Sequence, residues 1–334
     1  MSSDRGTAVA EFSEFAELAD SYRRELLAHC YRMLGSYQDA EDLVQETLVR
    51  AWRGYPRFDG RSSLRTWLHR IATNVCLTAL ASADRRILPS GLGGPVDAAH
   101  PELSRLDAAP WLQPAPTAGL LDRPDDPAAI VALRDSTRLA LVAAYQVLPA
   151  RQRAVLLLVE VAAFSPAEVA GILDVSVTAV RSLLQRARLA VASALPDQDR
   201  VVAPPDLDTE LLRRYLAAFE SGDTNELADL LRADVRYEMP PIARWFSGRA
   251  AVLDHHERRA FTRPHRALPT SANGYPALAM YTGDDGGSFR AHGIHLVEQE
   301  AGSITRIVVF LDPALFPAFG LATTLPGSGR YSSS

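Results

Sequence analysis

The stretch VSVTAVRSLLQRAR, residues 175–188, carries three arginines, no acidic residue and an apolar stripe, although the whole chain of 334 residues has a net charge of −5. Val180 and Leu184 are spaced as the buried positions of a helix. The polar and basic positions share the opposite face: Thr178, Arg181, Ser182, Gln185 and Arg186. Such a helix is suited to present its N-terminal half to a DNA major groove. The alternative is an ordinary basic surface helix.

The residues before this stretch predict a second, shorter helix. Ser165 followed by Glu168 is the pattern of a capping box, in which each side chain bonds the backbone N–H of the other residue. We expect a helix from there to about Leu173, a two-residue turn, and a second helix that begins after the cap Ser176 and ends near Ala194. Two helices joined this closely have helix-turn-helix spacing.

The composition is that of a globular protein. The chain is 47% hydrophobic and 22% charged, and its length suits two or three domains. No apolar run approaches the roughly 18 residues of a membrane span, and the N-terminus has acids where a signal peptide has bases, so we expect a cytoplasmic protein with no membrane partner. The two cysteines, Cys30 and Cys76, are too few for a zinc site or a disulfide framework. Buried thiols are predicted, with a redox pair as the alternative.

The periodicity divides the chain into three ordered blocks. Helical pattern runs through residues 12–83 and returns over residues 128–195. Residues 84–127 are rich in Pro, Gly, Ala and Asp without a sustained period, which is typical of a flexible linker. A shorter linker precedes residues 206–325, where strand-like runs follow helices. The predicted fold is multidomain: two all-α domains joined by a flexible linker, followed by an α+β domain.

Charges are sorted along the first block. Residues 39–46 (DAEDLVQE) contain four acids and no base, whereas residues 50–70 contain six arginines and the single acid Asp59. The acidic run suits a basic protein partner, and the basic run suits phosphates. Either run alone is equally well explained as a solvated helix face. Aromatic residues interleaved with the arginines favour single-stranded DNA, because they stack on unpaired bases: Trp52, Tyr55, Phe58 and Trp67.

Two long segments of the helical blocks carry a family resemblance. DAEDLVQETLVRAWRGYPRF followed by GRSSLRTWLHRIATNV resembles region two of the extracytoplasmic-function (ECF) sigma factors. LPARQRAVLLLVEVAAFSPAEVAGILDVSVTAVRSLLQRAR resembles their region four. Together they cover about residues 12–195, in the order of the family. The resemblance implies a promoter-recognition subunit of bacterial RNA polymerase, with a helix-turn-helix in region four and the linker along the RNA path of the enzyme.

The resemblance also implies residue roles. The residues matching the helix that docks on the clamp of the largest core subunits are Asp39, Glu41, Asp42, Leu43, Gln45 and Glu46. The loop that captures a flipped base, and the helix that melts and reads the −10 element, match Phe58, Asp59, Gly60, Arg61, Ser62, Ser63, Arg65, Trp67, Arg70, Thr73 and Asn74. The helix that reads the −35 element matches Ser176, Thr178, Arg181, Ser182, Gln185, Arg186 and Arg188. Leu183 stands where the family often has a base, so the −35 sequence cannot be copied from relatives.

The third block begins with helices and continues with strand-like runs. Gly and Asp turns separate the runs, which read VRYEM, PALAMY, FRAHGIHLVEQ and ITRIVVFLD. The order of elements is similar to the SnoaL-like cone fold that some of these sigma factors carry. PWLQP, residues 110–114, resembles a linker motif of that subgroup, and its Trp111 and Leu112 predict an anchor that docks on another part of the protein.

A cone fold encloses a pocket, for which the sequence offers the candidates Tyr237, Met239, Trp245, His292 and His295, together with Glu238. His292 and His295 are three residues apart in a predicted strand, so we expect only one of them to point inward. His255 and His256 lie among charged residues of a basic helix and are expected to be solvated. The sequence has no evident pair of nucleophile and base, metal cluster or phosphate loop, so neither catalysis nor a cofactor is expected.

The sequence therefore predicts a non-enzymatic sigma factor with a fused C-terminal regulatory domain. Its predicted partners are bacterial core RNA polymerase and promoter DNA, with a small molecule in the C-terminal domain as a further candidate. One alternative is a cyclase-like or isomerase-like enzyme domain fused to DNA-binding helices. The other is a conventional DNA-binding transcription regulator, which would bind an operator without core polymerase.

Overall fold

The computed structural model divides the chain into two compact units. The described residues are 15–96, 103–120, 138–194, 209–284 and 287–326. Unit 1 comprises Met1–Arg86 and Ala118–Val201, and unit 2 comprises Ile87–Thr117 and Val202–Ser334. The parts of the predicted domains and linker that lie outside the described residues are 12–14, 97–102, 121–137, 195, 206–208 and 285–286.

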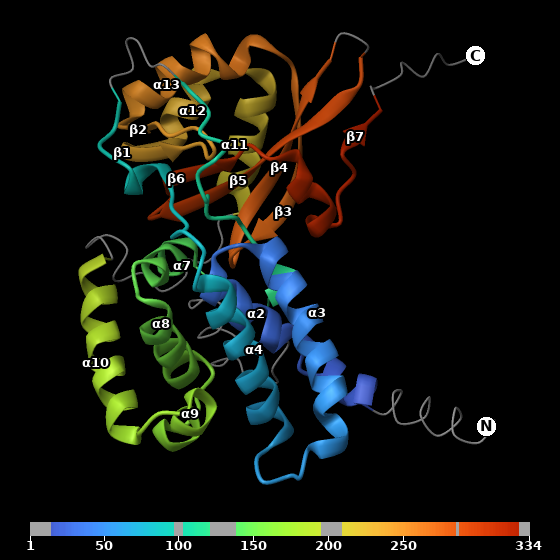
Figure 1. Cartoon of the computed structure of the whole chain (residues 1–334). Helices are drawn as coiled ribbons and strands as arrows, with labels where there is room; N and C mark the ends of the chain where they lie inside the picture. Colours follow the sequence, from blue (N-terminus) through green and yellow to red (C-terminus); the bar gives the residue numbers. More distant parts are fainter. Residues whose placement is uncertain (1–14, 97–102, 121–137, 195–208, 285–286, 327–334) are drawn as a thin grey trace, which may run out of the picture. The chain divides into compact units, whose positions relative to one another are not determined.

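The first half of unit 1 is a bundle of three helices (Figure 1): α2, Arg23–Leu34; α3, Tyr37–Gly54; and α4, Leu64–Leu80. Their apolar stripes recur at the helical period and face one another, which buries Leu26 and Leu68 completely. Cys30 and Cys76 are buried free thiols, as the sequence predicts.

Serine caps set the start of two of these helices. The Ser36 hydroxyl accepts a hydrogen bond from the Asp39 N–H (3.2 Å) at the start of α3. The Ser63 hydroxyl accepts one from the Thr66 N–H (3.1 Å) at the start of α4. Each cap satisfies a backbone donor that has no partner inside the helix. Gly35 lies between α2 and α3 with φ of 71°, a left-handed conformation that ends α2 at little cost.

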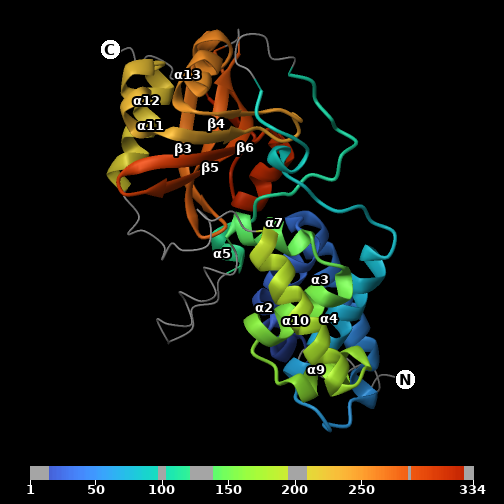
Figure 2. The same cartoon turned by 90° about the vertical axis from the view of Figure 1, so that its left-hand side faces the viewer.

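Residues 138–194, the longest described part of the second half of unit 1, form four helices: α7, Leu139–Gln146; α8, Ala150–Leu156, continued by a π-helical turn, Leu157–Val161; α9, Pro166–Leu173; and α10, Val177–Ala194. The capping box of Ser165 and Glu168 is present, and Ser176 caps α10 by accepting from the Ala179 N–H at 3.1 Å. The predicted helix-turn-helix is thus confirmed. Within unit 1, α9 packs on α4 and α7 packs on α2 (Figure 2).

Unit 2 is α+β, as predicted. Its longer helices are α11, Thr209–Ser221; α12, Thr224–Leu230; and α13, Arg249–Arg258. Its strands are β1, Leu231–Glu238; β2, Trp245–Ser247; β3, His265–Ala272; β4, Tyr275–Gly283; β5, Phe289–Glu300; β6, Ser303–Phe310; and β7, Thr324–Leu325. They form one sheet in the order β2-β1-β6-β5-β4-β3, with β7 on β5. The β1–β6 pair is parallel, and the other pairs are antiparallel.

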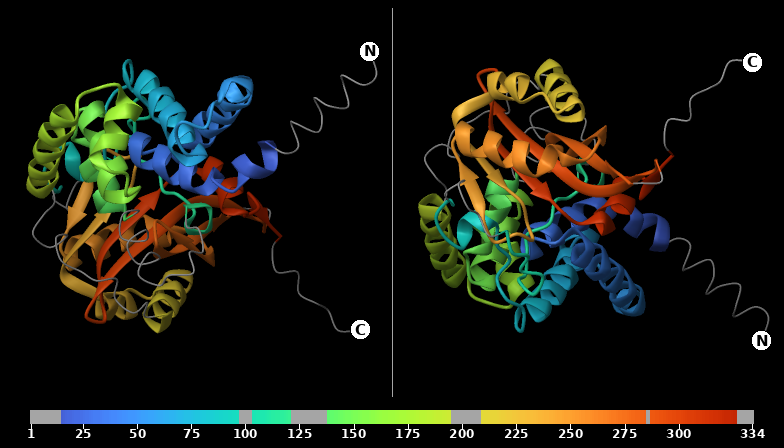
Figure 3. Two further views of the ribbon diagram at one scale, coloured as in Figure 1. Left: turned by 90° about the horizontal axis from the view of Figure 1, so that it is seen from below. Right: turned by 90° about the horizontal axis from the view of Figure 1, so that it is seen from above.

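The sheet is curved and packs against the helices of unit 2 to enclose one hydrophobic core (Figure 3). Tyr215 of α11, Val252 of α13 and Ile307 of β6 are fully buried in this core. The four predicted strand runs coincide with β1, β4, β5 and β6. The long strand β3 is not among them because its sequence HRALPTSA interrupts the alternation with Pro269. Proline is tolerated there because β3 lies at the edge of the sheet.

Residues 87–96 and 103–117, here called the strap, belong to unit 2 and bond to it through the main chain. The sequence predicts a flexible linker at these positions, and the structure differs. The hydrogen bonds run from Val96 N–H to Trp245 O (2.9 Å) and from Leu106 N–H to Pro241 O (2.8 Å). Ala115 accepts from the Asn273 N–H (2.9 Å) and donates its own N–H to the Asn273 side-chain oxygen (3.0 Å). Almost any residue can form such main-chain hydrogen bonds, so a composition rich in Pro and Gly does not reveal them.

Among the described residues, none of the helices combines the length and the hydropathy needed to traverse a bilayer.

Candidate functional site

The acidic residues of α3 present an open face. Asp42, Gln45 and Glu46 are exposed, Glu41 and Leu43 are half-buried, and Val44 on the opposite face belongs to the core. Two of these carboxylates are paired: Asp39 forms an ion pair with Arg86, and Glu46 pairs with Arg50 of the same helix at 2.5 Å. The exposed Asp42 and the half-buried Glu41 keep the first turns of α3 negatively charged, which suits a basic protein partner.

The loop before α4 is exposed and bends at Gly60, where φ is 69°. Asp59 accepts from the Arg61 N–H at 3.2 Å and pairs with the Arg61 guanidinium at 2.5 Å, and the hydrogen bonds and charge of Arg61 lower the pKa of Asp59. Phe58 and Trp67 lie beside the loop with ring centres 4.9 Å apart. Both are half-buried, so each ring keeps a face available for stacking.

The predicted −10 residues of α4 divide between the surface and the interior. Arg70 and Asn74 are exposed, whereas Thr73 is buried with its hydroxyl 3.0 Å from His29 Nε2. Arg65 is engaged inside unit 1: its Nε donates to the Glu25 carboxylate at 2.8 and 3.1 Å. Of the predicted set, the structure therefore leaves the loop, Trp67, Arg70 and Asn74 accessible.

Arg65 also joins the two halves of unit 1. Its NH2 donates to the Ala162 carbonyl at 2.7 Å, and its guanidinium lies 4.3 Å from the ring centre of Phe164. Phe164 in turn makes an edge contact with His69 at 5.0 Å. A residue of the predicted −10 surface is thus held by the segment that precedes the helix-turn-helix.

A buried arginine makes a second connection between these halves. Arg153 of α8 is 4% exposed and donates to the Gln146 side chain at 2.6 Å, to the backbone oxygens of Gln146 and Leu148 at 3.1 Å, and to the Met33 carbonyl at the end of α2. Burial lowers the pKa of Arg153 to about 10, so the guanidinium stays charged at neutral pH. Charged hydrogen bonds of this kind are the stronger ones in proteins.

The predicted −35 residues gather on one face of α10. All seven are exposed: Ser176, Thr178, Arg181, Ser182, Gln185, Arg186 and Arg188. Val180, Leu184 and Ala187 on the opposite face are buried against α8 and α9. Arg188 forms an ion pair with Glu160. Arg181 and Arg186 precede Arg188 and lie closer to the N-terminal half of the helix. This is the arrangement by which a recognition helix enters a major groove.

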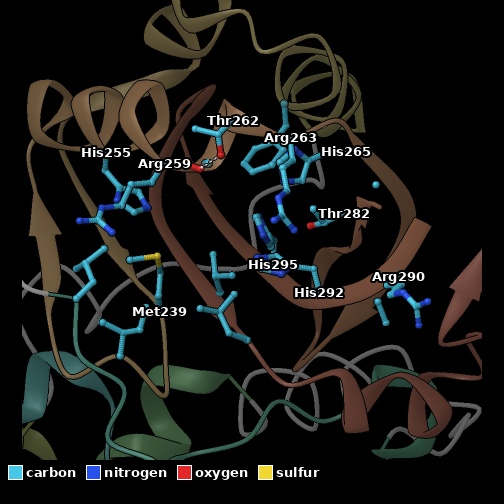
Figure 4. A pocket seen from close by; sticks show the side chains of 18 of the residues that line it. Met239, His255, Arg259, Thr262, Arg263, His265, Thr282, Arg290, His292 and His295 are labelled. Carbon is cyan, nitrogen blue, oxygen red and sulfur yellow. Dashed lines mark hydrogen bonds between the residues drawn. The ribbon is translucent and has the colours of Figure 1, made fainter. Parts of the chain in front are cut away.

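Unit 2 contains a cavity of about 620 Å³, a size that suits a small organic molecule. Of the predicted pocket residues, Tyr237, Met239, His292 and His295 line it. Trp245 does not, because its indole N–H donates to the Gly93 carbonyl of the strap at 2.7 Å. Figure 4 shows His265, Thr282, His292 and His295 on one side of the cavity and Met239, His255 and Arg259 on the other.

Both His292 and His295 face the cavity, so the expectation that only one points inward is wrong. The reason is an irregularity in β5. Met280 of β4 pairs with Gly293, but its neighbour Tyr281 pairs with Ala291, which leaves His292 as an extra residue. A β-bulge of this kind breaks the alternation of side chains between the two faces of a strand.

The expectation that His255 and His256 are solvated is also wrong, since they are 7% and 0% exposed. They lie on the inner face of α13, where Phe246 and Phe219 contact their rings. Sequence reasoning further missed the lining residues Leu103, Arg105, Arg259, Arg263, His265 and Arg290. The basic run RAAVLDHHERRAF held a signal, because its histidines recur on one helical face with Val252.

Burial keeps the histidines around this core neutral at neutral pH. It lowers the pKa of His255 to about 3 and the pKa values of His256 and His265 to about 4. His295 lies deepest, its Nδ1 is 3.1 Å from the Tyr215 hydroxyl, and its pKa is lowered well below the ordinary value by burial. Neutral imidazoles offer both a donor and an acceptor to a ligand.

We expect unit 2 to lose stability on acidification. A histidine whose pKa is lower in the folded chain than in the unfolded chain binds its proton more readily when unfolded, so stability is complete above about pH 6.5 and falls toward pH 4. The slope is roughly 1.4 kcal/mol per pH unit for each such histidine. Thermal melts between pH 7.5 and pH 4.5 measure the loss, and His256→Gln should make the pH dependence shallower. An unchanged pH dependence of stability in His256→Gln would show that groups other than His256 cause the loss of stability in acid.

A buried ion pair links the sheet of unit 2 to the strap. The Glu238 carboxylate accepts from Arg306 Nε at 3.0 Å and NH2 at 2.6 Å, and from the Ser90 N–H at 2.9 Å. Glu238 and Arg306 are 0% and 4% exposed. Glu238 thus has a structural partner and does not line the cavity. Although burial opposes ionisation, Arg306 and the Ser90 N–H keep the pKa of Glu238 below its ordinary value.

Comparison with known families matches three segments of the chain. Residues 18–86 match Sigma-70 region 2, residues 138–191 match Sigma-70 region 4, and residues 212–307 match the SnoaL-like domain. The segments follow one another in the order predicted from the sequence.

Individual proteins are similar to this chain over most of its length. The ECF RNA polymerase sigma factor SigG of Mycobacterium tuberculosis is 48% identical over 330 residues, which cover 97% of this chain and 88% of SigG. SigJ, an ECF RNA polymerase sigma factor of the same organism, is 33% identical over 233 residues, 68% of this chain and 64% of SigJ. The crystal structure of SigJ is similar with a TM-score of 0.59 at 26% identity, covering 92% of this chain and 99% of that chain.

Proposed function

The chain belongs to the ECF RNA polymerase sigma factors, and we propose that three of its surfaces divide the work of that function. The exposed acidic face of α3 binds core polymerase. The loop before α4, together with Trp67, Arg70 and Asn74, binds the −10 element. The exposed face of α10 binds the −35 element. The observation that carries the proposal is this α10 face, on which all seven expected residues are exposed while the opposite positions are buried.

Charge explains why the chain needs core polymerase. With a net charge of −5, the free chain repels DNA overall, and its basic surfaces are small. Each surface alone makes few phosphate contacts, so its affinity for DNA is low at physiological salt. On core polymerase both DNA-binding surfaces act together, and the second contact becomes intramolecular. The proposed site of this activity is the cytoplasm, where polymerase and DNA are.

The packing within unit 1 must open for promoter binding. The −10 and −35 elements lie about 25 base pairs apart, which is roughly 85 Å at about 3.4 Å per base pair. In unit 1, α4 and α9 are instead in contact, and Arg65 donates to the Ala162 carbonyl. We infer that core polymerase separates these halves and that Arg65 then exchanges Glu25, Ala162 and Phe164 for DNA.

The SnoaL-like unit 2 is proposed to regulate this opening. The strap begins directly after Arg86 and ends directly before Ala118, and both of these residues belong to unit 1. Its hydrogen bonds to unit 2 therefore shorten the free length of chain between the two halves of unit 1. Release of the strap would lengthen that connection, and a small molecule in the cavity is proposed to control whether the strap is released.

We assign no catalytic step to unit 2. Among the described residues, the single carboxylate that lines the cavity is Asp284, which pairs with Arg290 at 3.0 Å. The lining histidines are neutral at neutral pH, but within the described part of the chain none of them hydrogen-bonds to an acid or nucleophile of the lining. The cavity therefore favours binding over acid–base chemistry.

The proposal predicts that Asp42→Arg weakens binding to core polymerase by roughly tenfold or more, because it reverses an exposed charge at the centre of the acidic α3 face. Co-purification and fluorescence anisotropy with bacterial core enzyme measure the affinity. Glu210→Arg reverses another exposed acid, on α11 of unit 2; it is the control and should bind as the unchanged chain does. Equal affinity of Asp42→Arg and the unchanged chain would contradict the assignment of α3.

A further inference from the structure

The cavity of unit 2 combines apolar walls with an excess of positive charge. Its walls include Phe219, Tyr237, Ile242, Val309 and Leu311. Phe219 is central, since its ring makes edge contacts with the rings of His256, His265 and His295 at 5.1 to 5.5 Å. Rings arranged in this way suit a flat apolar body, because aromatic pairs prefer edge-to-face and offset geometry.

Four arginines line the same cavity: Arg105, Arg259, Arg263 and Arg290. Two of them are neutralised, Arg105 by Asp107 and Arg290 by Asp284. Arg259 and Arg263 have no acidic partner among the described residues, and Arg263 extends into the cavity toward His295 (Figure 4). Because the neighbouring histidines are neutral, the cavity keeps two uncompensated guanidinium charges, which favours an anion.

Two buried polar atoms of the lining have no hydrogen-bond partner among the described residues: His255 Nδ1 and Thr282 Oγ1. His255 is more than nine-tenths buried. Buried polar atoms normally have a hydrogen-bond partner in folded proteins. The position of these two atoms at a cavity therefore indicates that a ligand or water supplies the missing hydrogen bonds. They lie on opposite sides of the cavity, with the two free arginines beside them (Figure 4).

We propose that this cavity binds an organic anion with a flat apolar body and one carboxylate or sulfonate group. The anionic group pairs with Arg263 and Arg259, and the apolar body contacts Phe219 and Tyr237. This inference deepens the proposed ligand role of unit 2 and rests on that role, but not on promoter recognition.

The ligand would also contact the strap. Leu103 and Arg105 line the cavity, and the next residue, Leu106, donates its N–H to the Pro241 carbonyl at 2.8 Å. Arg105 also forms a backbone bridge with Ile242, which is itself a lining residue. An occupied cavity therefore adds contacts to the strap in its bound position, and an empty cavity lacks them. Ligand binding therefore opposes release of the strap, and release of the strap weakens ligand binding.

The test measures binding of three matched probes to the full-length chain by isothermal titration calorimetry: 2-naphthoate, 2-naphthalenemethanol and 2-naphthylmethylamine. We expect 2-naphthoate to bind about 10- to 100-fold more tightly than the neutral alcohol and the cation. Arg263→Gln should remove most of that preference. Arg258→Gln is the matched control, since Arg258 is exposed beside Arg259 and does not line the cavity.

Several outcomes would overturn the proposal. The alcohol or the amine binding as tightly as 2-naphthoate would exclude an anion site, and so would an unchanged preference in both Arg263→Gln and Arg259→Gln. Failure of all three probes to bind at millimolar concentration would exclude an aromatic anion. Circular dichroism checks that each variant is folded, and both replaced side chains are exposed, so folding should persist.

Trypsin gives an independent measure of the link to the strap, because it cleaves after Arg105. We expect saturating 2-naphthoate to slow this cleavage several-fold and the amine to leave it unchanged. Binding without protection would overturn the coupling to the strap. Neither assay contains polymerase or DNA, so both test the ligand proposal alone. A failure of promoter recognition would be detected separately, by transcription.

Discussion

Arg306→Met is expected to lower the free energy of unfolding of unit 2 by about 3–5 kcal/mol, the range typical for breaking one partner out of a buried ion pair. Arg306 donates twice to Glu238 and lies 3.7 Å from Glu298, so it neutralises two carboxylates that are 0% and 12% exposed in their side chains. Methionine fills a similar volume but removes the cation that lies beside both carboxylates. The expected loss therefore comes mainly from uncompensated buried charge.

Hydrogen exchange of the β1 and β6 peptides in the full-length chain, measured across a urea series, reports this loss. Arg232→Met is the matched control, because Arg232 lies on β1 and pairs with Asp234 and Glu300 at the surface. Surface pairs contribute about 0–1 kcal/mol, so the control should be close to the unchanged chain. Similar losses of unfolding free energy in the two variants would contradict the claim that burial makes the Arg306 pair more stabilising than a surface pair.

The double substitution Arg181→Ala with Arg186→Ala is expected to reduce promoter-directed transcription by roughly 30-fold to 20,000-fold. Both arginines are exposed on α10, and a good base contact contributes about 1–3 kcal/mol. The rate of run-off transcription at a fixed concentration of core polymerase measures the change, and binding to core should be unaffected.

A control for this double variant is Arg213→Ala, which removes an exposed arginine of α11 from a surface pair with Glu210. It should leave transcription unchanged. If the double variant transcribed as well as this control, the α10 face would not be the −35 surface. A proportional loss of core binding would instead indicate that α10 contacts the enzyme.

The helical part of the fold was predictable because its signals are local. Apolar stripes, the serine caps and the capping box of Ser165 and Glu168 each involve residues within four positions of one another. For the same reason the exposed face of α10 follows from its spacing alone. Long-range information is different, as Arg65 shows. Its basic character predicts a DNA contact, but nothing near it in sequence indicates that Glu25 and Phe164 hold it.

The C-terminal site depended more on features that a sequence hides. The bulge at His292 lets both His292 and His295 face the cavity where only one was expected to, and bulges leave no clear composition signal. His255 and His256 read as surface residues because charged neighbours surround them, although the inner face of α13 buries both. The strap is bound by main-chain groups, and Leu103 and Arg105 reach the cavity from more than 100 residues away in sequence. Only the folded sheet brings these residues together.

The central claim is that this chain directs core polymerase to promoters, and run-off transcription tests it most directly. Purified bacterial core enzyme would be given a pool of templates that includes the upstream region of the chain's own gene. The account predicts transcripts with defined start sites that require the full-length chain and are lost with Asp42→Arg. Binding of the folded chain to core polymerase without a specific transcript from any template in a diverse pool would contradict it.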